Sequence, residues 1–323
     1  MRLLVTGGSG FIGSNFVRFI LEHYQPEFVT NVDALTYAGN PENLTAIADD
    51  PRYEFHQADI ADREAVDTIL SAHKYFAIVN FAAETHVDRS IGSPENFVRT
   101  NLAGTEILLE AARDHGVKRF VQVSTDEVYG SLGEIGRFTE KSPLEPSSPY
   151  SASKAGADLL ALAAHRTFGQ EVIITRCSNN YGPYQFPEKL IPLMITRALA
   201  EHRLPVYGDG LNVRDWIHVD DHCRAVYAAL LDGTPGEIYN VGADAELENL
   251  EVVHHILEHL GKPPTLIEFV TDRLGHDRRY AIDSSKIRNE LGWKPIHEVR
   301  TGLSETIDWY RDHRDWWLPL LKK

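Results

Sequence analysis

The stretch Gly7-Gly8-Ser9-Gly10-Phe11-Ile12-Gly13 decides the fold of this chain. It follows an apolar segment at residues 2–6, which predicts a buried strand, and it opens a helical pattern at residues 11–23. Glycines at this spacing let the backbone turn sharply and approach a pyrophosphate at a helix N-terminus. Any tight strand-to-helix turn also favours glycine, so the spacing alone is a weak signal.

The carboxylate of Asp33 strengthens that signal. It ends a second predicted strand, residues 28–33, and lies twenty positions after Gly13. An acid at this place accepts hydrogen bonds from both hydroxyls of an adenosine ribose and repels a 2′-phosphate. Ala34 follows, where an NADP site favours Arg or Lys. We therefore expect NAD as the cofactor.

Strand-like and helix-like segments alternate through the first half of the chain. Further strands are expected at residues 53–56, 76–81, 120–124 and 172–175, and helices at 63–73, at 96–114 and from residue 150 onward. This alternation predicts an α/β fold, a Rossmann-type doubly wound parallel sheet with right-handed crossovers. We expect residues 1–176 to form an NAD-binding domain, with segments near 213–242 returning to it.

The residue composition of the sequence changes in the second half. Residues 177–189 are rich in Asn, Tyr, Pro and Gly, which predicts a functional loop rather than a regular element. Residues 216–219 and 238–241 are expected to be short strands that return to the main sheet, and residues 190–201, 250–260 and 303–311 to be helices. Residues 177–212 and 243–323 would then form a smaller substrate-binding lobe.

Composition narrows the class of protein. A formal net charge of −15 argues against a non-specific nucleic-acid binder, which needs a basic face. No apolar stretch approaches the ~20 residues that span a bilayer, so no membrane partner is expected. The chain has two cysteines, Cys177 and Cys223, and no secretion-signal pattern at its start. We expect a cytoplasmic protein without disulfides, and the sequence predicts no metal site.

Two neighbouring acids follow the predicted strand at residues 120–124. In Ser124-Thr125-Asp126-Glu127 the polar side chains come where ligands collect, past the carboxyl end of a parallel strand. Like charges push the pKa values of adjacent carboxyl groups apart, which suits one acid and one base. The alternative is that both acids cap a turn. Ser124 and Thr125 either hydrogen-bond a reacting oxygen or end the strand.

Tyr150 and Lys154 are four residues apart, which places both on one face of a helix. A phenol with a pKa near ~10 is a poor base unless helped. Lys154 would favour the phenolate and hold the nicotinamide ribose, while Tyr150 takes a proton from a sugar hydroxyl. The alternative is an ordinary pair on a helix surface.

Two further segments fit the cofactor. Asp59 and Ile60 follow the third strand and fit an adenine pocket, although an aspartate there is also a common turn residue. Phe81, Ala82 and Ala83 follow the fourth strand, where a dinucleotide crosses the sheet edge. Close packing of a helix is the alternative for the two alanines.

Nine motifs together resemble the extended short-chain dehydrogenase/reductase family and, within it, the dTDP-glucose 4,6-dehydratases. They cover essentially the whole chain, at residues 6–13, 33–40, 84–90, 124–130, 150–154, 176–184, 187–192, 207–216 and 275–283. The triplet Thr125-Asp126-Glu127 is the specific one, because epimerases of the same fold usually lack both acids. Ala34, Thr85, Leu274 and a short segment between Gly130 and Ser148 depart from the commonest pattern.

The resemblance implies a dehydration of dTDP-glucose to dTDP-4-dehydro-6-deoxyglucose without net change in NAD. Tyr150 would deprotonate the 4-hydroxyl as hydride leaves C4, Glu127 would remove the C5 proton, and Asp126 would protonate the departing C6 hydroxyl. Hydride would then return to C6. The resemblance also implies a homodimer formed by helices at residues 96–114 and 150–168, and a product that feeds rhamnose or another deoxysugar.

The residue patterns and the resemblance together assign three sets of site residues. The catalytic set is Thr125, Asp126, Glu127, Tyr150 and Lys154. The NAD set is Gly7, Gly10, Phe11, Ile12, Gly13, Asp33, Leu35, Thr36, Gly39, Asp59, Ile60, Phe81, Ala82, Ala83, Thr100, Ser124, Tyr150, Lys154, Cys177 and Asn180. The substrate set is Thr85, Thr125, Asn179, Lys189, Leu190, Tyr207, Arg214, Asn249, Arg273 and His276, where Arg and Lys suit a diphosphate.

Several alternatives stay open at this point. Arg273 and His276 are also compatible with a solvated charge and a structural turn. A UDP-sugar 4,6-dehydratase or a 4-epimerase could use the same scaffold, since thymine and uracil differ by one methyl group, worth ~1 kcal/mol of burial. A non-catalytic NAD-binding sensor is the rival from a different class, and the combination of Tyr150, Lys154 and both acids counts against it.

Overall fold

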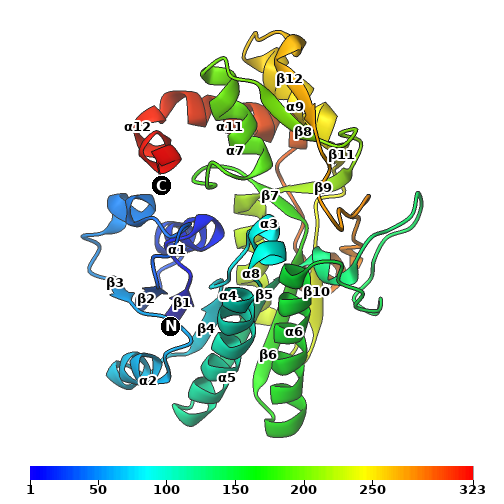
Figure 1. Cartoon of the computed structure of the whole chain (residues 1–323). Helices are drawn as coiled ribbons and strands as arrows, with labels where there is room; N and C mark the ends of the chain where they lie inside the picture. The colour runs from blue at the N-terminus through cyan, green and yellow to red at the C-terminus, as the bar shows by residue number, and fades with distance from the viewer. Residues whose placement is uncertain (323) are drawn as a thin grey trace.

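The central sheet has seven parallel strands in the order β10-β6-β5-β4-β1-β2-β3 (Figure 1). The computed structural model describes residues 1–322. The strands are β1 (Arg2–Thr6), β2 (Phe28–Asp33), β3 (Tyr53–Gln57), β4 (Ala77–Asn80), β5 (Arg119–Thr125), β6 (Glu171–Cys177) and β10 (Ile238–Val241). Because the strand order reverses at β1, the fold is doubly wound, as predicted.

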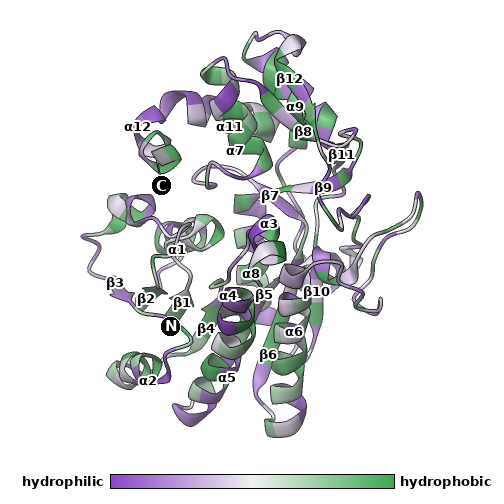
Figure 2. Cartoon of the chain, in the orientation of Figure 1, coloured by the Kyte–Doolittle hydropathy of each residue, from purple (hydrophilic) through white to green (hydrophobic). Residues whose placement is uncertain are grey.

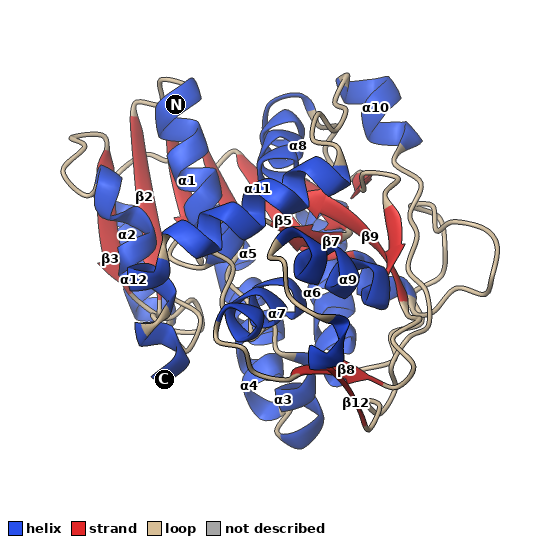
Figure 3. Cartoon of the chain, turned by 90° about the horizontal axis from the view of Figure 1, so that it is seen from above, coloured by secondary structure: helices blue, strands red, loops and turns tan. Residues whose placement is uncertain are grey.

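Helices cover both faces of this sheet (Figure 3). Leu3 and Val5 of β1 pack with α1 (Phe11–His23) and α8 (Val219–Asp232) on one face. Leu4 points to the other face, which is covered by α2 (Arg63–Ala72), α5 (Thr105–Asp114) and α6 (Pro149–Phe168). Side chains alternate along a strand, so a run of apolar residues is needed to bury both faces.

The helix expected at residues 96–114 is interrupted. It comprises α4 (Glu95–Phe97), a π-helical segment at Val98–Gly104 and then α5. Within the π segment, the Asn101 side chain donates to the main-chain oxygen of Glu84 at 3.0 Å and to the Ser153 hydroxyl at 2.8 Å. π turns are rare and often lie at functional sites. This one ties a cavity-lining loop to α6.

The second lobe contains two small sheets and a helical layer. One sheet has the order β11-β9-β7 and the other pairs β12 with β8. Its strands are β7 (Asn179–Tyr181), β8 (Leu204–Tyr207), β9 (Val213–His218), β11 (Glu246–Glu248) and β12 (Ile267–Val270). Its main helices are α7 (Leu190–Leu199), α9 (Asn249–His259) and α11 (Val299–Asp312), and they share one apolar core.

Two expectations for this half were wrong. The segment at residues 177–189 is not purely a loop, because β7 pairs with β9 through Asn179 and Trp216. The strand at residues 216–219 does not return to the main sheet; it is the end of β9, in the three-stranded sheet. The strand at residues 238–241 does return, as β10 beside β6. The division into domains at residue 176 stays a prediction.

The remaining elements are short. They are α3 (Val87–Gly92), α10 (Ser285–Leu291), α12 (Arg314–Trp317) and 3₁₀ helices at Pro41–Ile47, Asp126–Tyr129, Pro264–Leu266 and Pro319–Lys322. Of the helices in residues 1–322, none is both long and apolar enough to cross a membrane.

Candidate active site

Two adjoining cavities lie past the carboxyl ends of the central strands. The first, of about 470 Å³, extends from the glycine turn to Tyr150, and the second, of about 340 Å³, lies toward the smaller lobe. Their shared lining residues are Thr85, Glu127, Asn179, Glu188, Lys189, Leu190 and Trp216. A ligand that fills both cavities would therefore pass Glu127.

The structure brings nearly all the predicted residues to these cavities. Every residue of the expected NAD set except Leu35 lines the first cavity, as do Thr125, Asp126 and Glu127. All of the expected substrate set except Thr125 line the second. Leu35 stays a prediction: it is not among the residues that line the two cavities, and its backbone has a φ of +53°. Its N–H donates to Asp33 Oδ1 at 2.8 Å, so it orients that carboxylate.

The glycine turn leaves no room for side chains. A Cβ on Gly7 would lie 2.6 Å from the main-chain nitrogen of Ala82, and one on Gly13 would lie 2.2 Å from the oxygen of Gly7. Asp33 is fixed beside this turn, because Oδ2 also accepts from Ser9 N at 2.9 Å. Burial raises the pKa of Asp33, and the backbone N–H donors oppose that rise. This end of the cavity therefore fits a pyrophosphate and a ribose.

Asp59 lines the cavity but already has two partners. Its Oδ2 pairs with Arg99 at 2.6 Å, and its Oδ1 accepts from Ala61 N at 2.8 Å. Asp59 is therefore a turn aspartate, which was the alternative expected from the sequence, and it also lines the cavity. Arg99 comes from the π-helical segment and also lines the cavity, a contact that the sequence did not predict.

The start of α6 presents Tyr150 and Lys154 to the same cavity. Ser148 and Ser151 form a reciprocal capping box and Pro149 occupies the first turn, which fixes where the helix begins. Lys154 Nζ donates to the main-chain oxygen of Val123 at 2.7 Å. Both side chains are buried, so the alternative of a surface pair is wrong.

Asp126 and Glu127 have unlike surroundings. Asp126 is 1% exposed, and burial raises its pKa well above the ordinary range, with further rises from Glu127 and Asp215 that Arg214 and Thr125 oppose only in part. Burial also raises the pKa of Glu127, but Arg214, Lys189 and Arg273 oppose this. The surroundings thus favour the neutral form of Asp126. They favour the charged form of Glu127 more than that of Asp126. The pair can supply one acid and one base.

The phenol of Tyr150 is held protonated by the protein alone. Burial raises its pKa well above 10, and Glu127 and Cys177 raise it further, while a hydrogen bond with Thr125 lowers it. Burial lowers the pKa of Lys154. The surroundings within the protein therefore favour the neutral phenol of Tyr150.

Three cations converge on the second cavity. Arg214 donates to the main-chain oxygen of Asp277 at 2.9 Å and lies 4.3 Å from the Tyr280 ring. Arg273 is paired with Asp88 at 2.5 Å, with a quarter of its side chain exposed, so the alternative of a freely solvated charge is wrong. Lys189 Nζ donates to the main-chain oxygen of Thr85 at 2.8 Å. This cluster can bind a diphosphate bidentately.

His276 is a partly engaged member of the substrate set. Its Nδ1 lies 2.6 Å from Asp272 Oδ1, and its ring meets that of Tyr207 edge-on, with centroids 6.3 Å apart. Burial lowers its pKa. The side chain therefore belongs both to a turn and to the cavity wall.

Sequence reasoning missed several cavity residues. They are Tyr37, Glu84, His86, Asp88, Arg99, Gln185, Phe186, Glu188, Trp216 and Tyr280. Glu188 is the most informative, because it lies at the junction of the cavities with its Oε2 3.3 Å from His86 Nε2. The signal was available: Glu188 and Trp216 fall within the motifs at residues 187–192 and 207–216.

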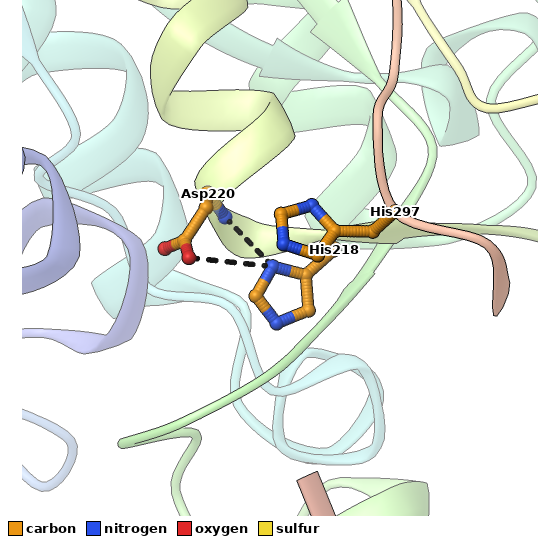
Figure 4. A group of neighbouring side chains, drawn as sticks. All are labelled: His218, Asp220 and His297. Atoms are coloured by element: carbon orange, nitrogen blue, oxygen red, sulfur yellow. Dashed lines mark hydrogen bonds and ion pairs between the residues drawn. The ribbon is translucent and has the colours of Figure 1, made fainter. Parts of the chain in front are cut away.

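Within residues 1–322, one further cluster brings potential metal ligands together: His218, Asp220 and His297, with ligand atoms within 4.8 Å (Figure 4). The two rings are stacked, with centroids 4.1 Å apart. Asp220 N donates to His218 Nδ1 at 3.2 Å, and His297 Nδ1 pairs with Asp221 Oδ2 at 3.0 Å. Lone pairs lie in the ring planes, so stacked rings point theirs side by side rather than at one ion. We assign the cluster a structural role.

Comparisons with known proteins identify the family. A family model described as GDP-mannose 4,6 dehydratase matches residues 4–306. A dTDP-glucose 4,6-dehydratase of Streptomyces niveus is 55% identical over 324 residues, which cover 99% of this chain and 96% of that relative. The chain belongs to the dTDP-glucose 4,6-dehydratase family.

A solved structure of this family has the same fold as the chain. DesIV, a dTDP-glucose 4,6-dehydratase from Streptomyces venezuelae crystallised with NAD bound, is 53% identical, with 99% of this chain and 100% of that chain covered and a TM-score of 0.97. A UDP-glucose 4-epimerase from Thermotoga maritima shares 31% identity, with 97% and 99% covered and a TM-score of 0.89. The scaffold is thus common to both activities, while the sequence is nearer to the dehydratases.

Proposed function

We propose that this chain dehydrates dTDP-glucose to dTDP-4-dehydro-6-deoxyglucose. The observation that carries the proposal is the placement of Asp126 and Glu127 in the cavity that also holds Tyr150 and Lys154. A 4-epimerase moves a hydride at C4 and has no use for a second acid–base pair. The identity of 50–55% to dTDP-glucose 4,6-dehydratases supports the same choice.

NAD is the cofactor. The first cavity fits it, because the glycine turn excludes side chains at one end, Asp33 is fixed beside that turn, and the catalytic set lies at the other end. When bound there, NAD would supply the acceptor for the hydride of C4 and the donor of the hydride to C6, with Asp33 and the glycine turn holding one end of it and Tyr150 and Lys154 lying at the other.

The chain's own residues move the protons. Tyr150 accepts the proton of the 4-hydroxyl as the 4-ketone forms. The ketone acidifies the C5 proton, which the Glu127 carboxylate removes. Asp126, held neutral by burial, gives its proton to the C6 hydroxyl, which leaves as water. Glu127 then returns its proton to C5 as C6 is reduced.

The remaining proton has a short route back. At the end of the cycle, Tyr150 carries the proton taken from the 4-hydroxyl. Asp126 lacks the proton that it gave to the departing water. The Thr125 hydroxyl donates to Asp126 Oδ1 at 3.4 Å and lowers the pKa of Tyr150, so Thr125 is the proposed relay between the two groups. Return of the proton restores the enzyme, and the net change is the loss of one water from the sugar.

The second cavity is proposed to hold the nucleotide half of the substrate. Lys189, Arg214 and Arg273 would bind the diphosphate, and the Tyr207 ring, 5.4 Å from the Arg273 guanidinium, would stack near the base. Asn179, Asn249 and His276 line the same cavity and complete the proposed contacts. This order places the sugar at Glu127, where the cavities meet.

We also propose a homodimer formed by α5 and α6. Apolar side chains are exposed on and beside these helices: Leu159 and Phe168 are each 57% exposed, and Val98 is 51% exposed. Hydrophobic residues colour stretches of both helices in Figure 2. A second copy would cover them. A cytoplasmic location remains part of the proposal, supported by two cysteines that are buried and unpaired.

The test is turnover of a defined substrate. Purified protein with dTDP-glucose should form a product with the alkaline absorbance of a 4-keto sugar, and UDP-glucose should be used less well, by about fivefold in kcat/KM if one buried methyl group sets the preference. Formation of dTDP-galactose, or no turnover at all, would contradict the proposal.

A further inference from the structure

The C-terminal segment makes a specific bond to the N-terminal half of the chain. The indole Nε1 of Trp316, in α12, donates to Asn43 Oδ1 at 2.9 Å. Asn43 lies in the 3₁₀ helix at Pro41–Ile47 and is 2% exposed. The two residues are 273 positions apart, and Figure 1 shows α12 beside the N-terminal part of the chain.

Asn43 also makes a hydrogen bond to the glycine turn at residues 7–13. Its Nδ2 donates to the main-chain oxygen of Ser9 at 3.0 Å. Ser9 stands between Gly8 and Gly10, and its own N–H donates to Asp33 Oδ2 at 2.9 Å. Three consecutive hydrogen bonds thus lead from the Trp316 indole to the Asp33 carboxylate, which lines the first cavity. Both polar atoms of the Asn43 side chain are therefore hydrogen-bonded, because Oδ1 accepts from Trp316 and Nδ2 donates to Ser9.

The same aromatic cluster holds a second cavity segment. Trp316 meets Tyr184 and Trp309 edge-on, at centroid distances of 5.4 Å and 5.2 Å. The guanidinium of Arg18, on α1, lies 3.9 Å from the Tyr184 ring. Tyr184 precedes Gln185, which lines the first cavity and accepts a hydrogen bond from the Tyr310 hydroxyl. The C-terminal segment therefore fastens two walls of the NAD cavity to each other.

We propose that Trp316 is a positioning residue for NAD: through Asn43 it holds the Ser9 turn in place and slows release of the cofactor. The inference rests on the proposed function, because a reaction that borrows and returns a hydride leaves the enzyme inactive if NAD escapes between the two transfers. Release then requires the latch, defined as the Trp316–Asn43–Ser9 hydrogen bonds, to open.

The test measures NAD release directly. Protein loaded with radiolabelled NAD is chased with excess unlabelled NAD, and the label retained on a filter is followed with time. Trp316→Phe keeps a ring and loses the donor, so we expect release about three- to tenfold faster, the factor typical of one hydrogen bond. Trp309→Phe is the matched control, since the indole nitrogen of Trp309 makes no hydrogen bond within residues 1–322; we expect a change below about twofold.

A second variant tests the route. Asn43→Ala removes the middle of the latch without touching the aromatic cluster, and it should also speed release, whatever Trp316→Phe does to folding. Adding Trp316→Phe to Asn43→Ala should have no further effect, because the two changes break one chain of bonds. Multiplied effects in the double variant, or equal release from Trp316→Phe and Trp309→Phe, would overturn the latch.

The results of these experiments distinguish a failure of the latch from a failure of the proposed function. If the wild type turns over dTDP-glucose while Trp316→Phe and Asn43→Ala hold NAD as it does, the latch alone is wrong. A wild type that binds no NAD would overturn both.

Discussion

Asp126 lines only the first cavity, whereas its neighbour Glu127 lies at the junction of both. Adjacent residues at a strand end thus face different surroundings. Glu127 and Asp215 raise the pKa of Asp126 and Arg214 alone among the cations opposes them, while Arg214, Lys189 and Arg273 all lower the pKa of Glu127. That difference, rather than the mere presence of two acids, supports the proposed acid role of Asp126 and base role of Glu127.

Replacing Glu127 with Gln should separate the half-reactions. Oxidation at C4 does not need this carboxylate, so reduced nicotinamide should still form in a single turnover. Elimination should slow by about 10²- to 10⁴-fold, the usual contribution of a positioned base. In deuterated water the variant should lose exchange at C5; unchanged incorporation of solvent deuterium there would remove Glu127 as the base.

Replacing Tyr150 with Phe should block the reaction earlier. Without the phenol no group accepts the 4-hydroxyl proton, so no reduced nicotinamide should appear on mixing with dTDP-glucose. Tyr37→Phe is a suitable control, because Tyr37 lines the same cavity and its phenol lies 3.2 Å from the Thr85 hydroxyl. Rapid cofactor reduction in Tyr150→Phe would show that another group is the base.

The activity should fall on the alkaline side of its optimum when Asp126 ionises. Burial raises the pKa of Asp126 well above the ordinary range, so the acid form persists to higher pH than that of an ordinary aspartate and is lost as the pH rises through the raised pKa. Asp126→Asn should reduce kcat by about 10²-fold or more and remove this limb from the kcat–pH profile. An unaltered alkaline limb in the variant would assign it to a different group.

Replacing Asp33 with Ala should weaken NAD binding by about 10- to 100-fold, since a hydrogen bond to a charged group contributes ~1.5–3 kcal/mol. The dissociation constant of dTDP should not change, because Asp33 does not line the second cavity. Calorimetry on NAD-free protein measures both. An NAD dissociation constant equal to that of the wild type would mean that the ribose lies elsewhere.

The fold could be predicted in large part because burial of both sheet faces leaves a strong pattern. The runs at residues 2–6, 28–33 and 238–241 are apolar enough to mark strands to the residue. The sheet to which β9 belongs could not be predicted, because its pairing with β7 joins residues far apart in sequence and β7 has only three residues, two of them asparagines. The π turn at Val98–Gly104 likewise left no local signal, and at its end Gly104 packs so close to Ile60 that a Cβ would lie 2.7 Å away.

The residues of the candidate site could likewise be predicted only in part. Gly7, Asp33, Tyr150 and Asp126 follow strand ends or begin a helix, so their meeting at one sheet edge could be predicted. Arg99 and Trp316 reach the cofactor region from segments that local patterns do not connect to it. Leu35 stays a prediction as a cofactor contact, and the structure adds that its backbone N–H donates to Asp33 Oδ1.

The fate of the hydrogen on C4 tests the central claim most directly. The protein is incubated with dTDP-glucose that carries deuterium at C4, in ordinary water, and the product is analysed by nuclear magnetic resonance. An internal transfer predicts that the deuterium appears at C6 of a 4-keto-6-deoxy sugar in the same molecule. Deuterium that stays at C4 of an epimerised sugar, or that is lost while C6 keeps its hydroxyl, would contradict the account.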